Sequence, residues 1–258
     1  MSRDRFVIAQ ISDIHCGDPR FDPVLAGRCV EQVRAAAPDL VLVPGDLTAD
    51  GYPEEYEEAM SLLGQMPCPW YVVPGNHDER NVGWRTFQRL FGKRWHRHHL
   101  DFGVATSERS CARLRLVACD SAEPDLNDGE LGRVRHSWIT DGFAGADDDF
   151  RIVMLHHHLV AVPNTGRERN TVSDAGDVLA TLAASRVDLV LSGHKHVPFA
   201  WNVNDMAVVT SGTASTWRIR GEVPPSFNLI EVYAEEYVLT TVWTSGEKPL
   251  IRKIPRLA

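Results

Sequence analysis

The sequence of 258 residues predicts an α/β fold in which a parallel β-sheet is joined by further antiparallel strands. Two observations predict it. Apolar runs of strand length alternate with amphipathic helical stretches in the first part of the chain, and short runs of alternating hydrophobicity replace the helices after Pro198. Strands that alternate with helices favour parallel pairing with right-handed crossovers. The change of pattern indicates two sheets.

The individual elements follow from the spacing of apolar residues and from their flanking signals. Helices are predicted over residues 24–37, 54–66, 82–91, 131–139 and 173–186. The second helix opens with acidic residues, which suits its dipole, and Ser173 is a candidate N-cap of the last. Buried strands are predicted over residues 6–11, 40–43, 70–73, 114–119, 151–155 and 189–191. An antiparallel meander is predicted over residues 199–203, 207–211, 227–233 and 238–243.

Composition limits the class of protein. Hydrophobic residues make up 43% and charged residues 24%, as in an ordinary globular chain. The net charge of −8 argues against broad nucleic-acid binding, which needs a basic surface. No linker or repeat interrupts the chain. We therefore expect one domain over residues 1–258, with a ligand-bearing part over about 1–197 and C-terminal strands over about 198–258. The basic segment 93–99 is interpreted as a surface loop.

The cysteines and the N-terminal segment indicate a cytoplasmic protein. The 5 cysteines are odd in number and form no CxxC pair, which favours free thiols in a reducing compartment. The first residues contain no hydrophobic region of a signal peptide. No apolar run reaches the roughly 18 residues of a membrane span, so no membrane partner is expected.

Potential metal ligands follow the predicted parallel strands. They are Asp13 and His15, then Asp46, then Asn76, His77 and Asp78, then His156, and finally His194 and His196. In open α/β sheets, ligands bind beyond the carboxyl ends of the strands. Nitrogen and oxygen donors without thiolates suit manganese, iron, zinc or cobalt better than a structural zinc site.

Each of these polar runs also has an ordinary interpretation. Gly-Asp and Gly-Asn-His-Asp sequences are common in turns, and the triplet His156-His157-His158 would suit a polar loop. Taken together, however, five such runs occupy equivalent positions at the ends of five predicted strands. The sequence therefore predicts a metal or phosphate site at one edge of the sheet.

These motifs, in their order along residues 13–196, resemble the calcineurin-like metallophosphoesterase superfamily. The longer sequence segments around these motifs are most similar to its class III cyclic-nucleotide phosphodiesterase-like branch; they are ISDIH, PGDLTADG, VPGNHD, LHHH and SGHKHV. The resemblance implies a four-layer α/β/β/α sandwich with two central mixed β-sheets. One departure is the pair His158-Leu159, where the branch often has two prolines.

The resemblance also implies a dinuclear metal centre and assigns its ligands. One ion would be held by Asp13, His15, Asp46 and His196. The other would be held by Asp46, Asn76, His156 and His194. Asp46 would bridge the two ions, which would be manganese or iron first, with zinc or cobalt as alternatives. His77 would contact the phosphate and protonate the leaving oxygen.

The implied function is hydrolysis of a phosphodiester, either a cyclic nucleotide or another small diester, by a hydroxide that bridges the metals. A phosphomonoesterase or nuclease of the same superfamily is the alternative among enzymes. A metal-binding scaffold without catalysis is the alternative outside them, and the presence of His77 argues against it. The expected partner is a small phosphate ester, and the branch allows a homodimer.

Some roles stay open at this point. His157 is either a support for a ligand or a substrate contact, and Asp78 either supports a ligand or caps its turn. Arg167 and Arg169 would either clamp a phosphate or lie in a solvated loop. The residues do not decide the substrate, the preference for diesters over monoesters, the metal pair or the oligomeric state.

Overall fold

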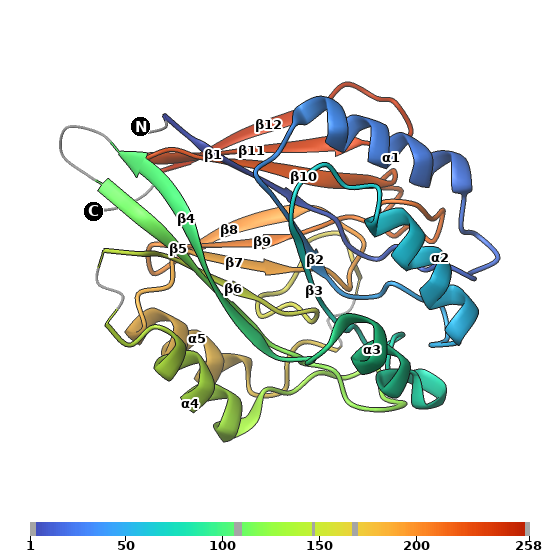
Figure 1. The fold of residues 1–258 in the computed structure, drawn as a ribbon, viewed down its shortest axis with the longest axis horizontal. Coiled ribbons are helices and arrows are strands. Elements are labelled where there is room, and N and C mark those ends of the chain that lie inside the picture. Colours follow the sequence, from blue (N-terminus) through green and yellow to red (C-terminus); the bar gives the residue numbers. More distant parts are fainter. Residues whose placement is uncertain (1–3, 106–109, 146–147, 167–169, 256–258) are drawn as a thin grey trace.

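Two six-stranded mixed β-sheets face each other in the computed structural model, which describes residues 4–105, 110–145, 148–166 and 170–255 (Figure 1). The strands of the first sheet, in spatial order, are β12 (Leu250–Pro255), β11 (Glu236–Trp243), β10 (Ser226–Val232), β1 (Phe6–Gln10), β2 (Leu40–Pro44) and β3 (Trp70–Val73). Those of the second sheet are β4 (His96–Ala105), β5 (Ser110–Ala118), β6 (Phe150–Met154), β7 (Leu189–Ser192), β9 (Met206–Thr210) and β8 (Phe199–Val203).

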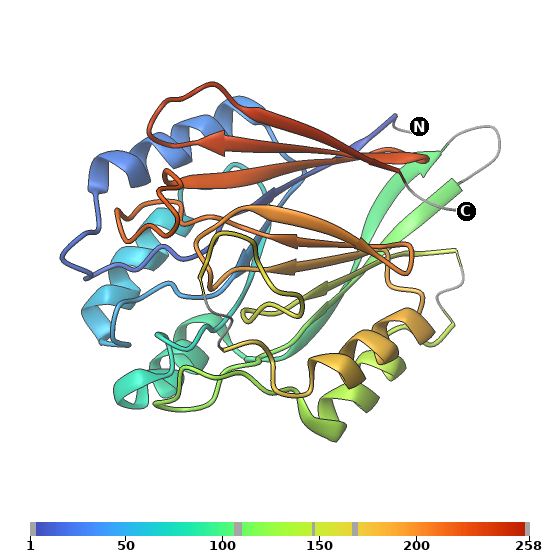
Figure 2. The ribbon, with the colours of Figure 1, turned by 180° about the vertical axis from the view of Figure 1, so that it is seen from behind.

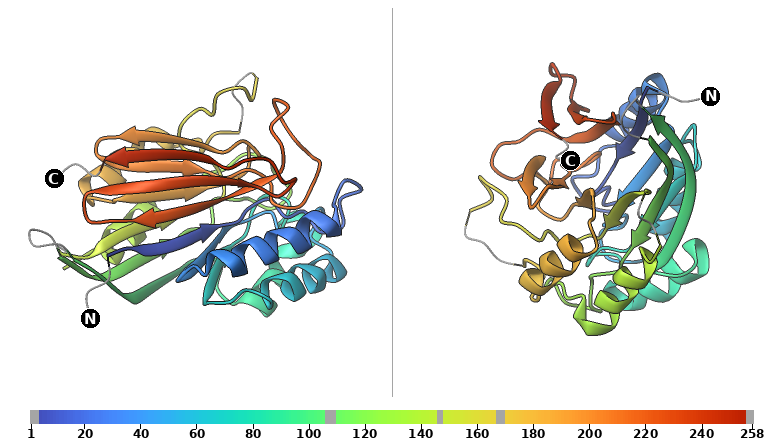
Figure 3. Two further views of the ribbon diagram at one scale, coloured as in Figure 1. Left: turned by 90° about the horizontal axis from the view of Figure 1, so that it is seen from above. Right: turned by 90° about the vertical axis from the view of Figure 1, so that its left-hand side faces the viewer.

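Helices cover the outer face of each sheet, and the end-on view in Figure 3 shows the resulting layers. Those packed on the first sheet are α1 (Pro23–Ala36), α2 (Pro53–Leu63) and α3 (Gly83–Phe91), the last preceded by a short 3₁₀ turn η1 (Arg80–Val82). Those packed on the second sheet are α4 (Gly132–Gly142) and α5 (Ala175–Ala184). The four-layer α/β/β/α sandwich is therefore confirmed.

The core between the sheets is aromatic and aliphatic. Phe6 of the first sheet packs on Phe102 of the second, and Phe102 stacks on Phe150 with ring centroids 5.0 Å apart. Leu40 and Leu42 face the same layer. Successive residues of a strand point to opposite faces of its sheet. The continuous apolar runs of these strands are therefore explained by burial of both faces.

Parallel pairing brings the strand ends of both sheets to one edge of the sandwich. Strands β1, β2 and β3 are parallel in the first sheet, and β5, β6, β7 and β9 are parallel in the second. The loops that follow these strands meet between the two sheets, as the view from behind shows (Figure 2). The fold thus places the predicted polar runs at a common edge.

The C-terminal strands do not form one meander, contrary to the prediction. Strands β8 and β9 belong to the second sheet, where β9 is parallel to β7, whereas β10 pairs antiparallel with β1 of the first sheet. Strand β12 was not predicted at all. Its residues are mostly exposed, and the adjacent Arg252 and Lys253 interrupt its apolar residues, so its apolar pattern is weak.

The histidine-rich segment 93–99 is not a surface loop, since most of it lies in the edge strand β4. His96 Nε2 donates a hydrogen bond to the carbonyl oxygen of Val72 at 2.8 Å, and the His98 ring stacks on Tyr71 at 3.7 Å. These half-buried histidines close the side of the sandwich between β3 and β4. Their polar character hid the strand from a hydrophobicity pattern.

The N-cap of α5 is Asp174, not Ser173. The Asp174 carboxylate accepts hydrogen bonds from the backbone nitrogens of Leu131 and Gly132, at the start of α4. It therefore links the two helices of this layer and does not cap its own helix.

Within the described ranges, no helix is long and apolar enough to cross a membrane. The single domain over residues 1–258 stays a prediction.

Candidate metal centre

The ligand-bearing loops follow five strands and contain all the predicted site residues, which are buried. They are Asp13 and His15 after β1, Asp46 after β2, Asn76 and His77 after β3, His156 after β6, and His194 and His196 after β7. The first two loops are joined by backbone hydrogen bonds, from Asp13 N to Gly45 O at 3.1 Å and from His15 N to Asp46 O at 3.0 Å. Ligands of separate strands are thus held in a common register.

The backbone is strained at most of these positions. Non-glycine residues rarely adopt positive φ, and such strain is often found at functional sites. The residues concerned and their φ values are Asp13 (55°), His15 (54°), Asp46 (54°), His194 (72°) and His196 (57°). Left-handed conformations therefore turn these side chains toward the space between the sheets.

A first group of donor atoms gathers on the side of β1. The ligand atoms of Asp13, His15, Asp46 and His196 all lie within 4.8 Å of one another. His196 Nε2 lies 3.2 Å from Asp13 Oδ1 and 3.1 Å from His15 Nε2. His15 Nε2 lies 3.7 Å from Asp46 Oδ2. This is the ligand set that the sequence predicts for the first ion.

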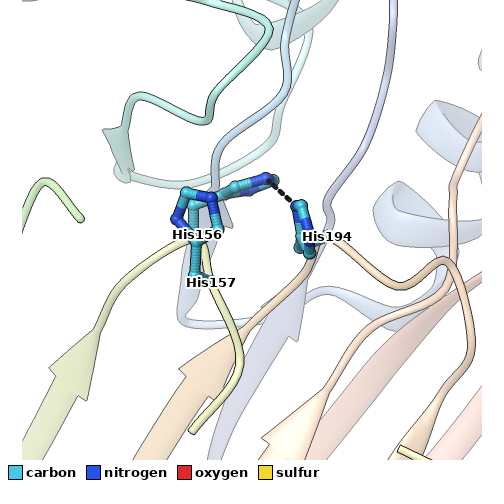
Figure 4. Close-up of side chains that lie close together, drawn as sticks. All are labelled: His156, His157 and His194. Atoms are coloured by element: carbon cyan, nitrogen blue, oxygen red, sulfur yellow. Dashed lines mark hydrogen bonds between the residues drawn. The ribbon is translucent and has the colours of Figure 1, made fainter. Parts of the chain in front are cut away.

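A second group gathers on the side of β6 and β7. His156 Nε2 lies 3.3 Å from Asp46 Oδ2 and 3.2 Å from Asn76 Oδ1. His194 Nδ1 lies 3.0 Å from Asn76 Oδ1 and 3.2 Å from His156 Nε2, the contact that the dashed line marks in Figure 4. Oxygen Oδ2 of Asp46 thus lies near both groups, as a bridging ligand would.

The donor set fits metal ions because its histidine tautomers are oriented for ligation. A backbone carbonyl only accepts, so His156 Nδ1 donates to Pro44 O at 2.7 Å and His196 Nδ1 donates to Arg218 O. In the neutral form that metal ligation requires, each of these two rings keeps its Nε2 lone pair toward the ligand groups. Nitrogen and oxygen lone pairs that converge with few protons between them are suited to cations.

The electrostatics of Asp46 and His156 agree with this. Burial opposes charge on both groups, yet their mutual attraction overrides it. As a result, the pKa of Asp46 lies well below its usual value and that of His156 is raised to about 9. The pair therefore favours a positive charge at the place where the second ion would bind.

His77 lies beside the ligand groups but is held differently. Its Nδ1 donates to the carbonyl oxygen of Ala49 at 2.5 Å, and its backbone nitrogen donates to Asp46 Oδ1 at 2.9 Å. Its ring meets the edge of His15 with centroids 4.6 Å apart. Burial and the nearby charge of Arg218 lower the pKa of His77. The Nε2 atom is left available to the cleft that His77 lines.

Asp78 serves both of the roles that the sequence leaves open. Its carboxylate accepts a hydrogen bond from Gly75 N at 2.8 Å within its own turn. It also accepts from the backbone nitrogens of Leu47 at 3.2 Å and Thr48 at 2.9 Å, which follow Asp46. The fully buried Asp78 thus joins the loops after β2 and β3 and positions the turn that carries Asp46.

His157 is fully buried beside the second group (Figure 4), and its ring nitrogens already have partners. Nδ1 is 2.9 Å from Ser121 Oγ, and Nε2 is 3.3 Å from the carbonyl oxygen of Asn127. It therefore packs against the loop after β5, and one of its ligand atoms lies within 4.8 Å of those of His156 and His194. His158 is buried as well, so this triplet does not lie in a solvent-exposed polar loop.

A cleft of about 160 Å³ opens above the ligand groups and contains three arginines that the sequence did not single out. The residues that line it are Asp46, Asn76, His77, Arg80, Asn127, Asn170, His194, His196, Arg218 and Arg220. Arg167 and Arg169, the arginines considered from sequence, lie outside the described residues. In the sequence, Arg218 and Arg220 stand out only because they alternate with the apolar Trp217 and Ile219. Such an alternation does not by itself indicate phosphate binding.

The glycine before His194 leads to a prediction. A Cβ on Gly193 would lie within 2.5 Å of Asp13 Oδ2 and 3.0 Å of Ser12 Cβ, so Gly193→Ala displaces the Asp13 carboxylate. We expect metal affinity to fall and hydrolysis to fall by about 10²-fold, the typical effect of misplacing a reacting group by about 1 Å. The control is Gly176→Ala in α5, where a Cβ meets nothing within 4 Å. Equal metal affinity in the two variants would contradict this assignment.

Comparison with known proteins agrees with this geometry. The family model for calcineurin-like phosphoesterases matches residues 6–198. A probable cyclic nucleotide phosphodiesterase of Synechococcus sp. is 32% identical over 203 residues, which cover 74% of this chain and 74% of that protein. A 3',5'-cyclic-nucleotide phosphodiesterase of Nostoc sp. is 25% identical over 249 residues, which cover 88% of each chain.

Solved structures confirm the fold. GAP50, described as the anchor in the inner membrane complex of Plasmodium, superposes with a TM-score of 0.76 at 16% identity, over 99% of this chain and 90% of that chain. At this identity, the likeness concerns the fold alone. Given the family match over most of its length, the chain belongs to the calcineurin-like phosphoesterase family.

Proposed function

We propose that the protein is a phosphodiesterase that requires two metal ions and hydrolyses a cyclic nucleotide or another small diester. One observation carries the proposal: Asp46 Oδ2 lies 3.7 Å from His15 Nε2 in one ligand group and 3.3 Å from His156 Nε2 in the other, in a cleft that Asp46 and His77 both line. The phosphodiesterase names of the relatives from Synechococcus and Nostoc support the choice of a diester.

The ligands assigned to the first ion are Asp13, His15, Asp46 and His196, and those assigned to the second are Asp46, Asn76, His156 and His194. We expect manganese or iron, with zinc or cobalt as alternatives, because nitrogen and oxygen donors accept all four. When bound, the ions supply a water of lowered pKa and positive charge for the phosphoryl group.

His77 is proposed as the group that contacts the phosphate and donates a proton to the leaving oxygen. The hydrogen bond from its Nδ1 to Ala49 O orients the ring, and in the imidazolium form Nε2 carries the proton to be donated. Asn76 Nδ2 donates to Asn127 Oδ1 at 3.2 Å, which keeps the Asn76 oxygen directed at the ligand groups.

The proposal includes a cytoplasmic location and a small phosphate ester as the partner. The free thiols of Cys16, Cys29, Cys68 and Cys119 support a reducing compartment. The net charge of −8 disfavours stable nucleic-acid binding, because such binding needs a basic surface that neutralises phosphates. A homodimer is the proposed assembly.

Metal removal tests the function. We expect the protein after chelation and dialysis to lose hydrolysis of bis(p-nitrophenyl) phosphate, and manganese or iron to restore it. The loss should be on the order of 10³-fold, since a metal contributes several kcal/mol of transition-state stabilisation. The monoester p-nitrophenyl phosphate, assayed in parallel, is expected to react more slowly. Undiminished hydrolysis by metal-free protein would exclude the mechanism.

A further inference from the structure

We propose that the cleft selects a phosphodiester that bears a second anionic group, a carboxylate or a phosphate, and that Arg218 and Arg220 bind this group. The inference rests on the proposed function and names its substrate class. Its basis is the arrangement of arginines around a site that is proposed to bind one phosphate.

The segment that carries these arginines inverts the usual distribution of polar and apolar side chains. Trp217 and Ile219 are 46% and 39% exposed, whereas the Arg218 side chain between them is 27% exposed and Arg220 is also partly buried. Both arginines line the cleft. Apolar side chains ordinarily take the buried positions, so the inversion indicates that the cleft needs these guanidinium groups.

Hydrogen bonds tie this segment to the loop that carries the first ligands. Thr213 Oγ1 donates to the carbonyl oxygen of Asp13 at 2.7 Å, and Ser215 Oγ donates to that of Ile14 at 2.9 Å. The Arg218 carbonyl in turn accepts from His196 Nδ1. The arginines are therefore held at a defined position beside the ligand groups and do not lie on an independent loop.

The arginines of the cleft are incompletely neutralised. Arg80 pairs with Asp50 at 3.0 Å. Arg218 lies 3.6 Å from Asp18, and that carboxylate is shared with Arg20 at 3.2 Å. For Arg220, the part of the chain that the structure describes provides no ion-pair partner. The positive charge left over exceeds what a singly charged phosphodiester needs once two metal ions are bound.

The lining of the cleft also disfavours recognition of a large apolar group. Among the described residues that line it, every side chain is polar or charged. Ligand pockets for drug-sized molecules are mostly apolar and measure roughly 300–1,000 Å³, and this cleft measures about 160 Å³. A nucleobase would find no apolar platform here, whereas a short anionic tail would find Arg218, Arg220, Asn127 and Asn170.

A set of matched diesters tests the inference with the metal-loaded enzyme. The substrates are p-nitrophenyl 2-carboxyethyl phosphate and p-nitrophenyl 2-phosphonoethyl phosphate, and p-nitrophenyl propyl phosphate is the neutral-tailed reference. The leaving group is common to all, so differences in KM report on the tail. We expect KM to be about 10- to 100-fold lower for at least one anionic tail, as charge-assisted hydrogen bonds imply. The two anionic arms distinguish carboxylate from phosphate recognition.

Variants assign the effect to its residues. With Arg218→Gln or Arg220→Gln, the ratio of the KM values for neutral and anionic tails should fall toward one. Arg133→Gln, an exposed arginine on α4, is the control and should keep the wild-type ratio. Calorimetry with 3-phosphonopropionate and butylphosphonate gives an independent ratio of Kd values.

The outcomes separate the inference from the proposed function. Hydrolysis of all three diesters with equal KM would overturn the inference and leave the function intact. If no diester is hydrolysed, the proposed function fails, and the calorimetric ratio alone decides the inference: a ratio near one overturns it. A preference that persists in both cleft variants would remove Arg218 and Arg220 from this role.

Discussion

Asp46→Ala is expected to release both metal ions and to lower diester hydrolysis by on the order of 10³-fold or more, the equivalent of several kcal/mol of transition-state stabilisation. The reason is geometric. Asp46 Oδ2 lies 3.7 Å from His15 Nε2 in one ligand group and 3.3 Å from His156 Nε2 in the other, so its removal affects both. The measurement is metal content per chain after dialysis, together with the rate.

The control for Asp46→Ala is Asp141→Ala, which removes an exposed carboxylate on α4. Asp46 is buried and also accepts a hydrogen bond from His77 N, so the fold of the variant is checked separately. Circular dichroism should show that both variants are folded. Full occupancy of both ions in folded Asp46→Ala would disprove the bridging assignment. Loss of a single ion would place Asp46 in one group only.

His77→Ala is expected to retain both metal ions and to lose about 10²- to 10⁴-fold in rate, the usual contribution of a general acid or base. His77 lies against the ligand groups, but its Nδ1 is engaged with Ala49 O and it is not needed to complete either ligand set. Metal content and rate are therefore expected to separate in this variant. The exposed His99→Ala is the matched control.

The leaving group sharpens this test. A p-nitrophenolate leaves without a proton, whereas an alkoxide needs one, so the loss in His77→Ala should be larger for a dialkyl phosphodiester than for an aryl ester. Equal losses for both substrates would indicate that His77 contacts the phosphate without protonating the leaving oxygen. An unchanged rate would remove His77 from catalysis.

The ligand groups could be predicted from sequence because each ligand follows an apolar run that defines a strand end. Asp13, Asp46 and His156 occupy equivalent places after parallel strands, and parallel topology then brings them together. Arg218 and Arg220 could not be found in this way. They follow β9 at a distance, and hydrogen bonds of Thr213 and Ser215 with the first loop determine their position.

The same limit applies to the fold. The alternation of strands and helices up to β7 is local information, and it predicted the parallel strands of that part of the chain. The partner of a C-terminal strand is not local: β10 pairs with β1, so that Asn228 lies opposite Gln10. Strand β4 escaped prediction because His96 and His98 occupy partly buried positions through ring stacking and hydrogen bonding.

The packing between the sheets has a mechanical consequence for the ligand groups. Asp13, His15, Asp46 and Asn76 follow strands of the first sheet, whereas His156, His194 and His196 follow strands of the second. Each ligand group takes residues from both sheets, so the distance between the sheets sets the distances between the donor atoms of each group. Close-packed interiors are nearly incompressible, and Phe6 of the first sheet, packed on Phe102 of the second with ring centroids 4.9 Å apart, acts here as a spacer. The aromatic core thereby fixes the distances between the ligands of the two sheets.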